Sequence, residues 1–253
     1  QAFSLVAGSY WCTVTDANGC TDLFTTNLNE PSEIFTNISV TNVSCNGVAD
    51  GSAVVNPSGG DGIYNVSWFN DTTDFLITEL AIGSYNVTVT DNTGCTTTTG
   101  ITMFNIGQPN TLILNAAVIA EPSCFGYANG SVEVTALGGS LPYSYNWLDS
   151  LNNIISTDSF SINLVAATYS VVVVDANGCI DTTSISLTSP EVILANVSTD
   201  STLCKGSSDG SATVNPTGGT SPYTYLWTGS GSTLSISNGL NATTTYYVSI
   251  TDL

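Results

Sequence analysis

Residues 169–179, YSVVVVDANGC, decide the fold of this chain. The same pattern recurs at residues 10–20, YWCTVTDANGC, and at residues 85–95, YNVTVTDNTGC, and its beginning recurs at residues 246–253, YYVSITDL. The four copies place an aspartate every 75 to 84 residues, at Asp16, Asp91, Asp175 and Asp252. A period of this length indicates a tandem array of repeats.

Each copy of this signature motif alternates large or apolar residues with small polar ones and then reaches Asp-x-x-Gly. The alternation predicts a half-buried strand, and Asp-x-x-Gly predicts a turn into the next strand. Turn signals recur about every 8 to 12 residues, and no segment has helical periodicity. The sequence therefore predicts an all-β fold of tandem immunoglobulin-like β-sandwich repeats, arranged end to end.

The domain organisation follows from aligning the copies of the motif. Boundaries are expected near Pro31, Pro109 and Pro190, each beside a short polar segment. Residues 1–31 are predicted to be the C-terminal part of a repeat, residues 32–109 and 110–190 complete repeats, and residues 191–253 a repeat truncated before its last strand. We expect the chain to be a window on a longer polypeptide, so its first partners are further repeats of the same polypeptide.

The charge composition excludes two classes of partner. The chain has 20 acidic residues against one basic residue, Lys205, and its net charge is −19. Nucleic acids and anionic membrane surfaces both require clustered Lys and Arg. No apolar run approaches the roughly 18 residues of a membrane span. We therefore expect no nucleic-acid binding and no membrane insertion.

Catalytic chemistry has few of its usual groups in this sequence. His and Arg are absent, so acid–base and nucleophilic schemes lack their common participants. The acidic residues in turn-like contexts are interpreted as backbone caps: Asp50, Asp61, Asp71 and Asp74. We predict no enzyme, no catalytic residue, no metal ligand and no cofactor. Calcium is the alternative, because acidic turns recur, but no turn has the dense ligand spacing of a calcium loop.

Aromatic residues recur on the third predicted strand of each repeat. Alternate positions carry Tyr, then Val or Tyr, then Trp, which places each trio on one face of its strand. Immunoglobulin-like sandwiches bury a tryptophan at this place, so we interpret the three tryptophans as core residues: Trp68, Trp147 and Trp227. Sugar-stacking platforms are the alternative interpretation.

Six of the seven cysteines recur at two positions of the repeat. The first predicted loop carries Cys45, Cys124 and Cys204, and the signature turn carries Cys20, Cys95 and Cys179. This pattern predicts an oxidising, extracellular compartment and makes all six disulfide candidates. The seventh, Cys12, stands where two other copies have valine, and both a buried free thiol and a partner for an upstream cysteine are open.

Two pairings of these cysteines are considered. Pairing within a repeat would join Cys45 to Cys95 and Cys124 to Cys179. In an immunoglobulin-like sandwich, however, those two positions lie at opposite ends, roughly 25 Å apart, whereas a disulfide requires Cα atoms within about 7 Å. We therefore favour a bond between repeats, Cys45 with Cys179, and keep the pairs within repeats as the second hypothesis.

Three motifs together resemble a known family, the SprB-type repeat of cell-surface gliding-motility adhesins. They are Cys-x-Gly-x-x-Asp/Asn-Gly-Ser, Gly-Gly-x-x-Pro-Tyr-x-Tyr-x-Trp and Gly-x-Tyr-x-Val-x-Val-x-Asp-x-x-Gly-Cys, and they cover essentially the whole chain. Two departures concern turns. Asp61-Gly62-Ile63 replaces the segment that ends in Pro before Tyr, and Ala167-Thr168 replaces the usual Gly-Ser or Gly-Thr.

The resemblance implies a very long extracellular protein at the cell surface, exported by a type IX secretion system and pulled against a substratum. Surface glycans or the substratum itself are then expected partners. It also implies a glycoprotein with O-glycosylation at Asp-Ser/Thr followed by an apolar residue or Thr. In this chain the candidates are Thr72, Ser150, Thr182 and Ser201.

The function expected from these observations is a structural stalk or filament segment of a very long cell-surface adhesin, involved in attachment and gliding motility. One alternative is a carbohydrate-binding surface module whose site is formed by the variable segments 70–79 and 148–161. Another is a filament subunit that polymerises by donor-strand exchange, because the two end segments each lack strands that the complete repeats have.

Overall fold

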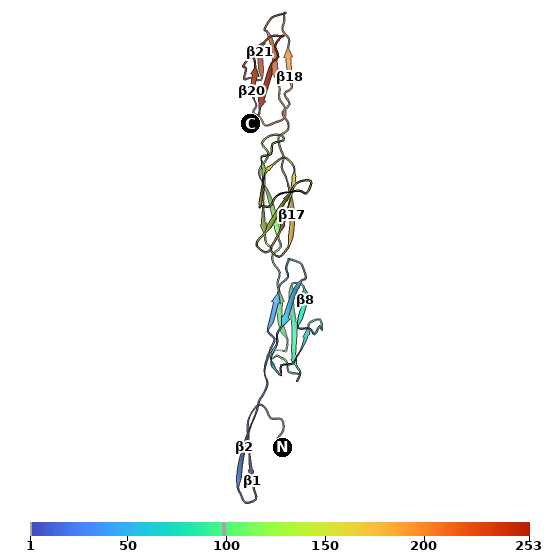
Figure 1. Ribbon diagram of the computed structural model, residues 1–253, viewed down its shortest axis with the longest axis vertical. Coiled ribbons are helices and arrows are strands. Elements are labelled where there is room, and N and C mark those ends of the chain that lie inside the picture. Colours follow the sequence, from blue (N-terminus) through green and yellow to red (C-terminus); the bar gives the residue numbers. More distant parts are fainter. Residues whose placement is uncertain (1, 98–99) are drawn as a thin grey trace. The chain divides into compact units, whose positions relative to one another are not determined.

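The computed structural model describes residues 2–97 and 100–253; residue 1 of the predicted segment 1–31 and residues 98–99 of the predicted segment 32–109 lie outside the described part. Within those ranges the chain consists of antiparallel strands and loops without a helix (Figure 1), which confirms the predicted all-β fold. No described segment forms an apolar helix of membrane-spanning length. The chain divides into two compact units, Gln1–Asn110 and Thr111–Leu253.

The first unit begins with a two-stranded hairpin. Strands β1 (Gly8–Thr15) and β2 (Thr21–Leu28) pair antiparallel without a register shift. Among the described residues these strands pair only with each other, and large side chains such as Trp11 and Phe24 are exposed. The hairpin thus has the strands of the signature motif without an opposing sheet to cover them.

The remainder of the first unit is a β-sandwich. One sheet has the strand order β4–β5–β8 and the other has the order β10–β9–β7, with a short additional pair, β3–β6. The strands are β3 (Ser32–Phe35), β4 (Ile38–Thr41), β5 (Gly51–Val55), β6 (Ser58–Gly60), β7 (Tyr64–Trp68), β8 (Leu76–Leu80), β9 (Gly83–Asp91) and β10 (Thr102–Ile106).

The core of this sandwich follows directly from the alternation in sequence. Val66 and Trp68 on β7, and Val87 and Val89 on β9, point inward because every second side chain of a strand lies on the same face. They pack in one buried cluster with apolar residues of β5 and β8. Burial of these side chains is the main favourable contribution to the stability of the sandwich.

The second unit contains a sandwich with the complete strand set. Its sheets have the orders β11–β12–β15 and β14–β13–β16–β17. The strands are β11 (Ile113–Ala120), β12 (Gly130–Leu137), β13 (Ser144–Leu148), β14 (Ile154–Ser156), β15 (Phe160–Leu164), β16 (Thr168–Val174) and β17 (Ile180–Ser186). The first, second and fifth strands form one sheet, and the fourth, third, sixth and seventh form the other, which is the immunoglobulin-type arrangement. Trp147, Val171 and Val173 are fully buried between them.

The second unit also contains a smaller sandwich. Its sheets are β18–β19–β21 and β20–β22. The strands are β18 (Val197–Asp200), β19 (Gly210–Val214), β20 (Thr224–Thr228), β21 (Ile236–Leu240) and β22 (Tyr247–Thr251). Its core holds Trp227 and Val214, but Val248 and Ile250 of β22 are only partly buried. This core is less completely covered than the other two.

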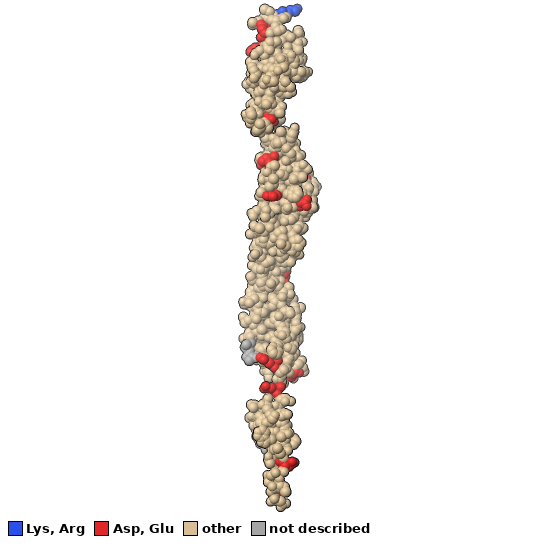
Figure 2. Space-filling model, turned by 90° about the vertical axis from the view of Figure 1, so that its left-hand side faces the viewer, with Lys and Arg blue, Asp and Glu red and all other residues tan. Residues whose placement is uncertain are grey.

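Acidic side chains are distributed over the surface in small separate groups. Figure 2 shows no continuous acidic patch on the face in view. Within the described ranges no group of three His, Cys, Asp or Glu side chains is arranged to hold a metal ion. The acidic side chains on the face in view are therefore interpreted as solvated surface groups rather than as an anionic binding site.

Candidate functional site

The signature turn is built on its aspartate. In the second unit, Oδ1 of Asp175 accepts hydrogen bonds from the backbone N–H groups of Asn177, at 2.9 Å, and Cys179, at 2.8 Å. Asp91 and Asp16 make the same pair of bonds to the residues two and four positions further on. The carboxylate thus acts as the centre of an Asx turn and fixes the backbone of the cysteine.

The second carboxylate oxygen reaches a distant part of the chain. Oδ2 of Asp175 accepts the backbone N–H of Ser140 at 2.7 Å, and Oδ2 of Asp252 accepts that of Thr220 at 2.8 Å. The glycine before Ser140 makes this approach feasible, because a Cβ on Gly139 would lie 2.7 Å from Asp175 Oδ2. We call this contact between the Gly-Gly segment and the signature aspartate the carboxylate lock.

Hydrogen bonds lower the pKa of two of the signature aspartates, Asp175 and Asp91. Burial alone would raise the pKa of Asp175, but the N–H groups of Cys179, Ser140 and Asn177 outweigh it and hold the pKa below its usual range. The Thr93 hydroxyl has the same effect on the pKa of Asp91. Both aspartates are therefore charged at neutral pH and serve as acceptors rather than as acids.

The first loop is closed by the Asp or Asn that precedes Gly-Ser. Oδ1 of Asp50 accepts the backbone N–H of Ser44 at 2.8 Å, and Oδ1 of Asn129 accepts that of Ser123 at 3.0 Å. The Ser44 hydroxyl and backbone lower the pKa of Asp50. The cap predicted for Asp50 is confirmed, and Asp61 likewise accepts the N–H of Ile63. Each closed loop presents its cysteine at the end of a sandwich.

The cysteines are present in two oxidation states. Cys45 and Cys179, both half-buried, are disulfide-bonded. The free thiols are Cys12, Cys20, Cys95, Cys124 and Cys204. Cys95 and Cys124 are the partners that pairing within a repeat would require, and neither is bonded here. Cys12 is exposed on the hairpin, so the buried-thiol alternative for it does not apply in this structure.

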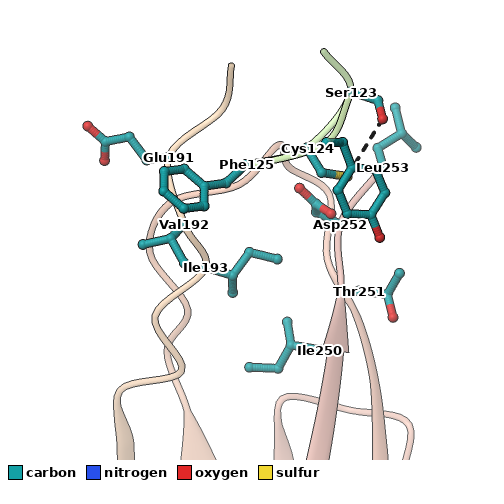
Figure 3. Close-up of a pocket in the computed structure, with 11 residues that line it drawn as sticks. Ser123, Cys124, Phe125, Glu191, Val192, Ile193, Ile250, Thr251, Asp252 and Leu253 are labelled. Atoms are coloured by element: carbon teal, nitrogen blue, oxygen red, sulfur yellow. Dashed lines mark hydrogen bonds between the residues drawn. The ribbon is translucent and has the colours of Figure 1, made fainter. Parts of the chain in front are cut away.

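A pocket of about 530 Å³ lies beside Cys124 (Figure 3). Its lining includes Phe125 of the same first loop, Val192 and the signature residue Asp252. Within the second unit, a first loop of one repeat therefore faces a signature segment of the next. We interpret this pocket as a packing junction between the two repeats of the second unit.

The segment that leaves the first complete sandwich is tied to its first loop. Asn42 Oδ1 accepts the N–H of Gly107 at 2.8 Å, and Asn46 Nδ2 donates to the carbonyl of Pro109 at 3.1 Å. Gln108 Oε1 accepts the N–H of Gly47 at 3.1 Å. These bonds fix the direction in which residues 107–109 leave the sandwich.

The three tryptophans of the aromatic trios lie in the cores. Trp68, Trp147 and Trp227 are 2%, 0% and 3% exposed, so they cannot offer a ring face to a sugar. The indole N–H groups of Trp68 and Trp227 donate to the carbonyls of Asp74 and Leu234. That of Trp147 has no partner among the described residues.

Tyrosine corners are a feature that the sequence reasoning missed. The Tyr85 hydroxyl donates to the carbonyl of Ala81 at 2.9 Å, and that of Tyr169 donates to Val165 at 3.0 Å. Each bond spans four residues and fixes the loop that enters the signature strand. The signal was available, since a Tyr near the start of the sixth strand is typical of immunoglobulin-like sandwiches.

The remaining predicted sites lie on the surface. All four O-glycosylation candidates have exposed side chains: Thr72, Ser150, Thr182 and Ser201. The variable segments 70–79 and 148–161 contain strands β8 and β14 with their turns, and neither segment lines the pocket beside Cys124.

Tandem antiparallel sandwiches with closed, cysteine-bearing ends define a β-sandwich repeat protein. The SprB repeat family model matches residues 37–73, 116–152 and 196–232, so the chain contains three SprB repeats, as its motifs predicted. Each match spans the first loop and the strand that carries the buried tryptophan. The match to this repeat family does not point to an enzyme family.

Two of the solved structures that match this chain are tandem arrays by their descriptions. The N-terminal eight immunoglobulin domains of Down syndrome cell adhesion molecule match with 13% identity over 87% of this chain and 32% of that chain, at a TM-score of 0.39. A tetra-tandem repeat from the extending region of a large adhesion protein matches with 17% identity over 98% and 71%, at a TM-score of 0.30. No curated protein sequence matches the chain.

Proposed function

We propose that this chain is a stalk segment of a very long cell-surface adhesin that takes part in attachment and gliding motility. The observation that carries the proposal is the construction of the sandwich ends. In the sandwich of residues 110–190 the carboxylate lock closes one end. In the sandwich of residues 32–109, bonds from residues 42–47 fix the segment that leaves the end with the first loop. Repeats that contact mainly their neighbours add length by repetition, which is what a spacer requires.

The proposed division of the chain has four parts: residues 1–31, 32–109, 110–190 and 191–253. Three separate apolar clusters support it, because each of the last three segments holds a core of its own. The hairpin in residues 1–31 carries the signature motif alone. The principal partners of each part are then neighbouring repeats.

We propose that Cys45 pairs with Cys179 and joins the first loop of one repeat to the signature turn of the next. Both residues are in the disulfide-bonded state, and the other five cysteines are free thiols. Within the second unit, the first-loop Cys124 lines the same pocket as Asp252. Asp252 is the signature aspartate, and in the signature motif the cysteine follows the aspartate by four residues, as Cys179 follows Asp175. This neighbourhood of a first loop and a signature segment supports a similar neighbourhood for Cys45 and Cys179.

Peptide mapping without reduction tests the pairing. We expect one crosslinked peptide that contains Cys45 and Cys179 and that separates when a reductant is added. Crosslinked peptides joining Cys45 to Cys95, or Cys124 to Cys179, would contradict the proposal. The Cys45→Ser variant should release the thiol of Cys179 for alkylation, which serves as a matched control.

Extracellular display, export by a type IX secretion system and O-glycosylation belong to the same proposal. The exposed hydroxyls of Thr72, Ser150, Thr182 and Ser201 support the glycan sites, because a transferase needs access to the oxygen. Intact-mass measurement of protein from its native cell surface tests this. Sugar masses that disappear in the corresponding Ala variants are expected, and a mass equal to that of the bare sequence would contradict it.

Two measurements on the full chain test the stalk function. Single-molecule stretching should give separate unfolding events for the sandwiches, because each has its own core. A glycan array should show no specific binding, since the aromatic trios are not available as stacking platforms. Specific, saturable binding of one glycan class would instead favour a carbohydrate-binding module.

A further inference from the structure

The same β-bulge recurs in the three sandwiches, on the strand that comes before the signature strand: β8, β15 and β21. In each, one residue has no partner in the register and stands directly before a buried leucine. These extra residues have positive φ angles of 60°, 59° and 76°, and they are Glu79, Asn163 and Gly239. A bulge leaves its extra residue outside the ladder and disrupts the pairing locally.

Of the three bulges, only that of β21 has an asparagine directly before a glycine. Asn238 precedes Gly239, whereas Thr78 and Ile162 take its place in the other two sandwiches. All three of these side chains are exposed, so exposure is a property of this position in every repeat. Within the described chain the amide of Asn238 has no hydrogen-bond partner.

The bulge also has room for the backbone to turn. A Cβ on Gly239 would come no closer than 3.9 Å to any atom beyond its chain neighbours. In an Asn-Gly sequence, the backbone nitrogen of the glycine can attack the side-chain carbonyl carbon of the asparagine, and no Cβ obstructs the approach. The reaction requires that the amide and the attacking nitrogen are free to turn toward each other, which the exposed bulge allows.

We propose that Asn238 is a site of spontaneous deamidation in the folded chain. The backbone nitrogen of Gly239 forms a bond to Cγ of Asn238, and the bond from Cγ to Nδ2 breaks. Ammonia leaves and carries away the amide proton of the glycine. The resulting five-membered succinimide takes up one water molecule. Opening at one carbonyl gives aspartate, and opening at the other gives isoaspartate, in which the main chain runs through the former side chain.

The chain has four further Asn-Gly sequences, and hydrogen bonds restrain each of them. Asn129 is held at both ends of its amide, because Oδ1 accepts the N–H of Ser123 and Nδ2 donates to the hydroxyl of the same serine. Asn46 and the attacking nitrogen of Gly47 both donate to the segment 108–109. Neither pair can reach the other without breaking these bonds.

The remaining two Asn-Gly sequences lie in signature turns, at Asn18 and Asn177. In both turns the N–H of the glycine donates to the carbonyl of the signature aspartate at 3.1 Å. The amide of Asn177 also donates to the hydroxyl of Ser140 at 3.0 Å. The attacking nitrogen therefore becomes available only when the turn opens, and this slows the reaction.

The modification has a structural consequence for β21. Isoaspartate adds one carbon to the main chain between two inward-facing residues, Ser237 and Leu240. Ser237 is 1% exposed, and its hydroxyl is hydrogen-bonded to that of Ser230 at 2.6 Å. Leu240 belongs to the apolar core. Because the lengthened strand cannot keep both in place, the third sandwich should loosen as the protein ages.

The test incubates the full, folded chain at mildly alkaline pH and follows every Asn-Gly site by peptide mapping. A deamidated peptide is heavier by about 1 Da, and the isoaspartate form separates from the aspartate form by chromatography. We expect Asn238 to react at least about tenfold faster than each of the other four, because at those sites a hydrogen bond must open first. In denaturant all five sites should react at similar rates.

The matched variant is Asn238→Gln, which keeps the amide but would have to close a six-membered ring and therefore reacts more slowly. After incubation the unaltered chain should lose protection from hydrogen exchange in residues 236–240, and the variant should retain it. Equal rates at all five sites in the folded chain, or a faster reaction at Asn18, would overturn the proposal. If the variant does not fold, the comparison of the five sites in the unaltered chain still decides the question.

Discussion

The backbone N–H of Ser140 donates a 2.7 Å hydrogen bond to Oδ2 of Asp175, 35 positions further along the chain. The same carboxylate holds the signature turn through Oδ1. One side chain therefore connects the entry of the third strand with the exit of the sixth. Thr220 and Asp252 repeat the relationship in the smaller sandwich at 2.8 Å.

Removing the charged acceptor should destabilise the second-unit sandwich. Asp175→Asn keeps an oxygen for the turn but places an NH₂ donor against the N–H of Ser140, and Asp175→Ala removes both contacts. We expect a lower midpoint of urea unfolding for both variants, with Ala the lower. Asp158→Asn, at an exposed position, is the control and should match the unaltered chain. Equal midpoints for all four proteins would contradict the role of the lock.

The stability of the chain should depend on pH through the carboxyl group of Asp175. The folded pKa of Asp175 is below its ordinary value of 3.8, so its contribution is present above that value and is lost as pH falls through the folded pKa. Protonation of the other carboxylates at low pH reduces the net negative charge and therefore the repulsion within the chain, which raises stability. The unaltered chain should therefore lose stability below about pH 4 more steeply than Asp175→Asn. Parallel pH profiles would exclude this contribution.

Close approach at the lock requires a glycine. Gly139 and Gly126 both have positive φ, 57° and 75°, but a Cβ on Gly139 would meet the carboxylate, and one on Gly126 would meet nothing within 4 Å. Gly126→Ala should cost about 1–2 kcal/mol of unfolding free energy from the left-handed backbone alone. Gly139→Ala should cost more, and the difference measures the contact with Asp175. Equal losses would show that no such contact limits the site.

Substitutions of the tryptophans distinguish the contribution of packing to stability from the contribution of the indole hydrogen bond. Trp147→Ala should lower the unfolding free energy by about 3–5 kcal/mol, because the ring is fully buried. Trp147→Phe should be milder than Trp68→Phe by about 1 kcal/mol, because only Trp68 loses a hydrogen bond, to the carbonyl of Asp74. Trp11→Ala, at an exposed position, is the control. Fluorescence-monitored denaturation measures all four changes.

The structure predicts how many cysteines react with a thiol label before and after reduction. Under native, non-reducing conditions we expect alkylation of the five free thiols, with half-buried Cys124 the slowest of them. Reduction should add Cys45 and Cys179. Mass spectrometry of labelled peptides reads each position separately. Labelling of Cys45 before reduction would contradict the oxidation states seen here.

The strands and the buried tryptophans could be predicted because both depend on local alternation. Val87 alternates with Val89 on β9, and Val171 alternates with Val173 on β16. A strand places such alternate positions on one face whatever the neighbouring sheet is. The cap at Asp50 was predictable for a similar reason, since the N–H donor of Ser44 lies only six residues away. The strands, the buried tryptophans and the cap could thus be predicted from residues close together in sequence.

Contacts that form only when the two sheets come together could not be predicted in the same way. Nothing local in the sequence relates Gly130 to Leu187, or Ser140 to Asp175. The tyrosine corner at Tyr169 is different, because its hydroxyl donates to a carbonyl only four residues earlier.

The segment that leaves the first complete sandwich is held by neutral groups. Asn42, Asn46 and Gln108 bond to backbone atoms, and none of them carries a charge that dissolved ions could screen or that a proton could remove. In a chain of net charge −19, long-range repulsion varies with ionic strength, whereas these bonds do not. The stiffness of this exit should therefore be the same in fresh water and in brine.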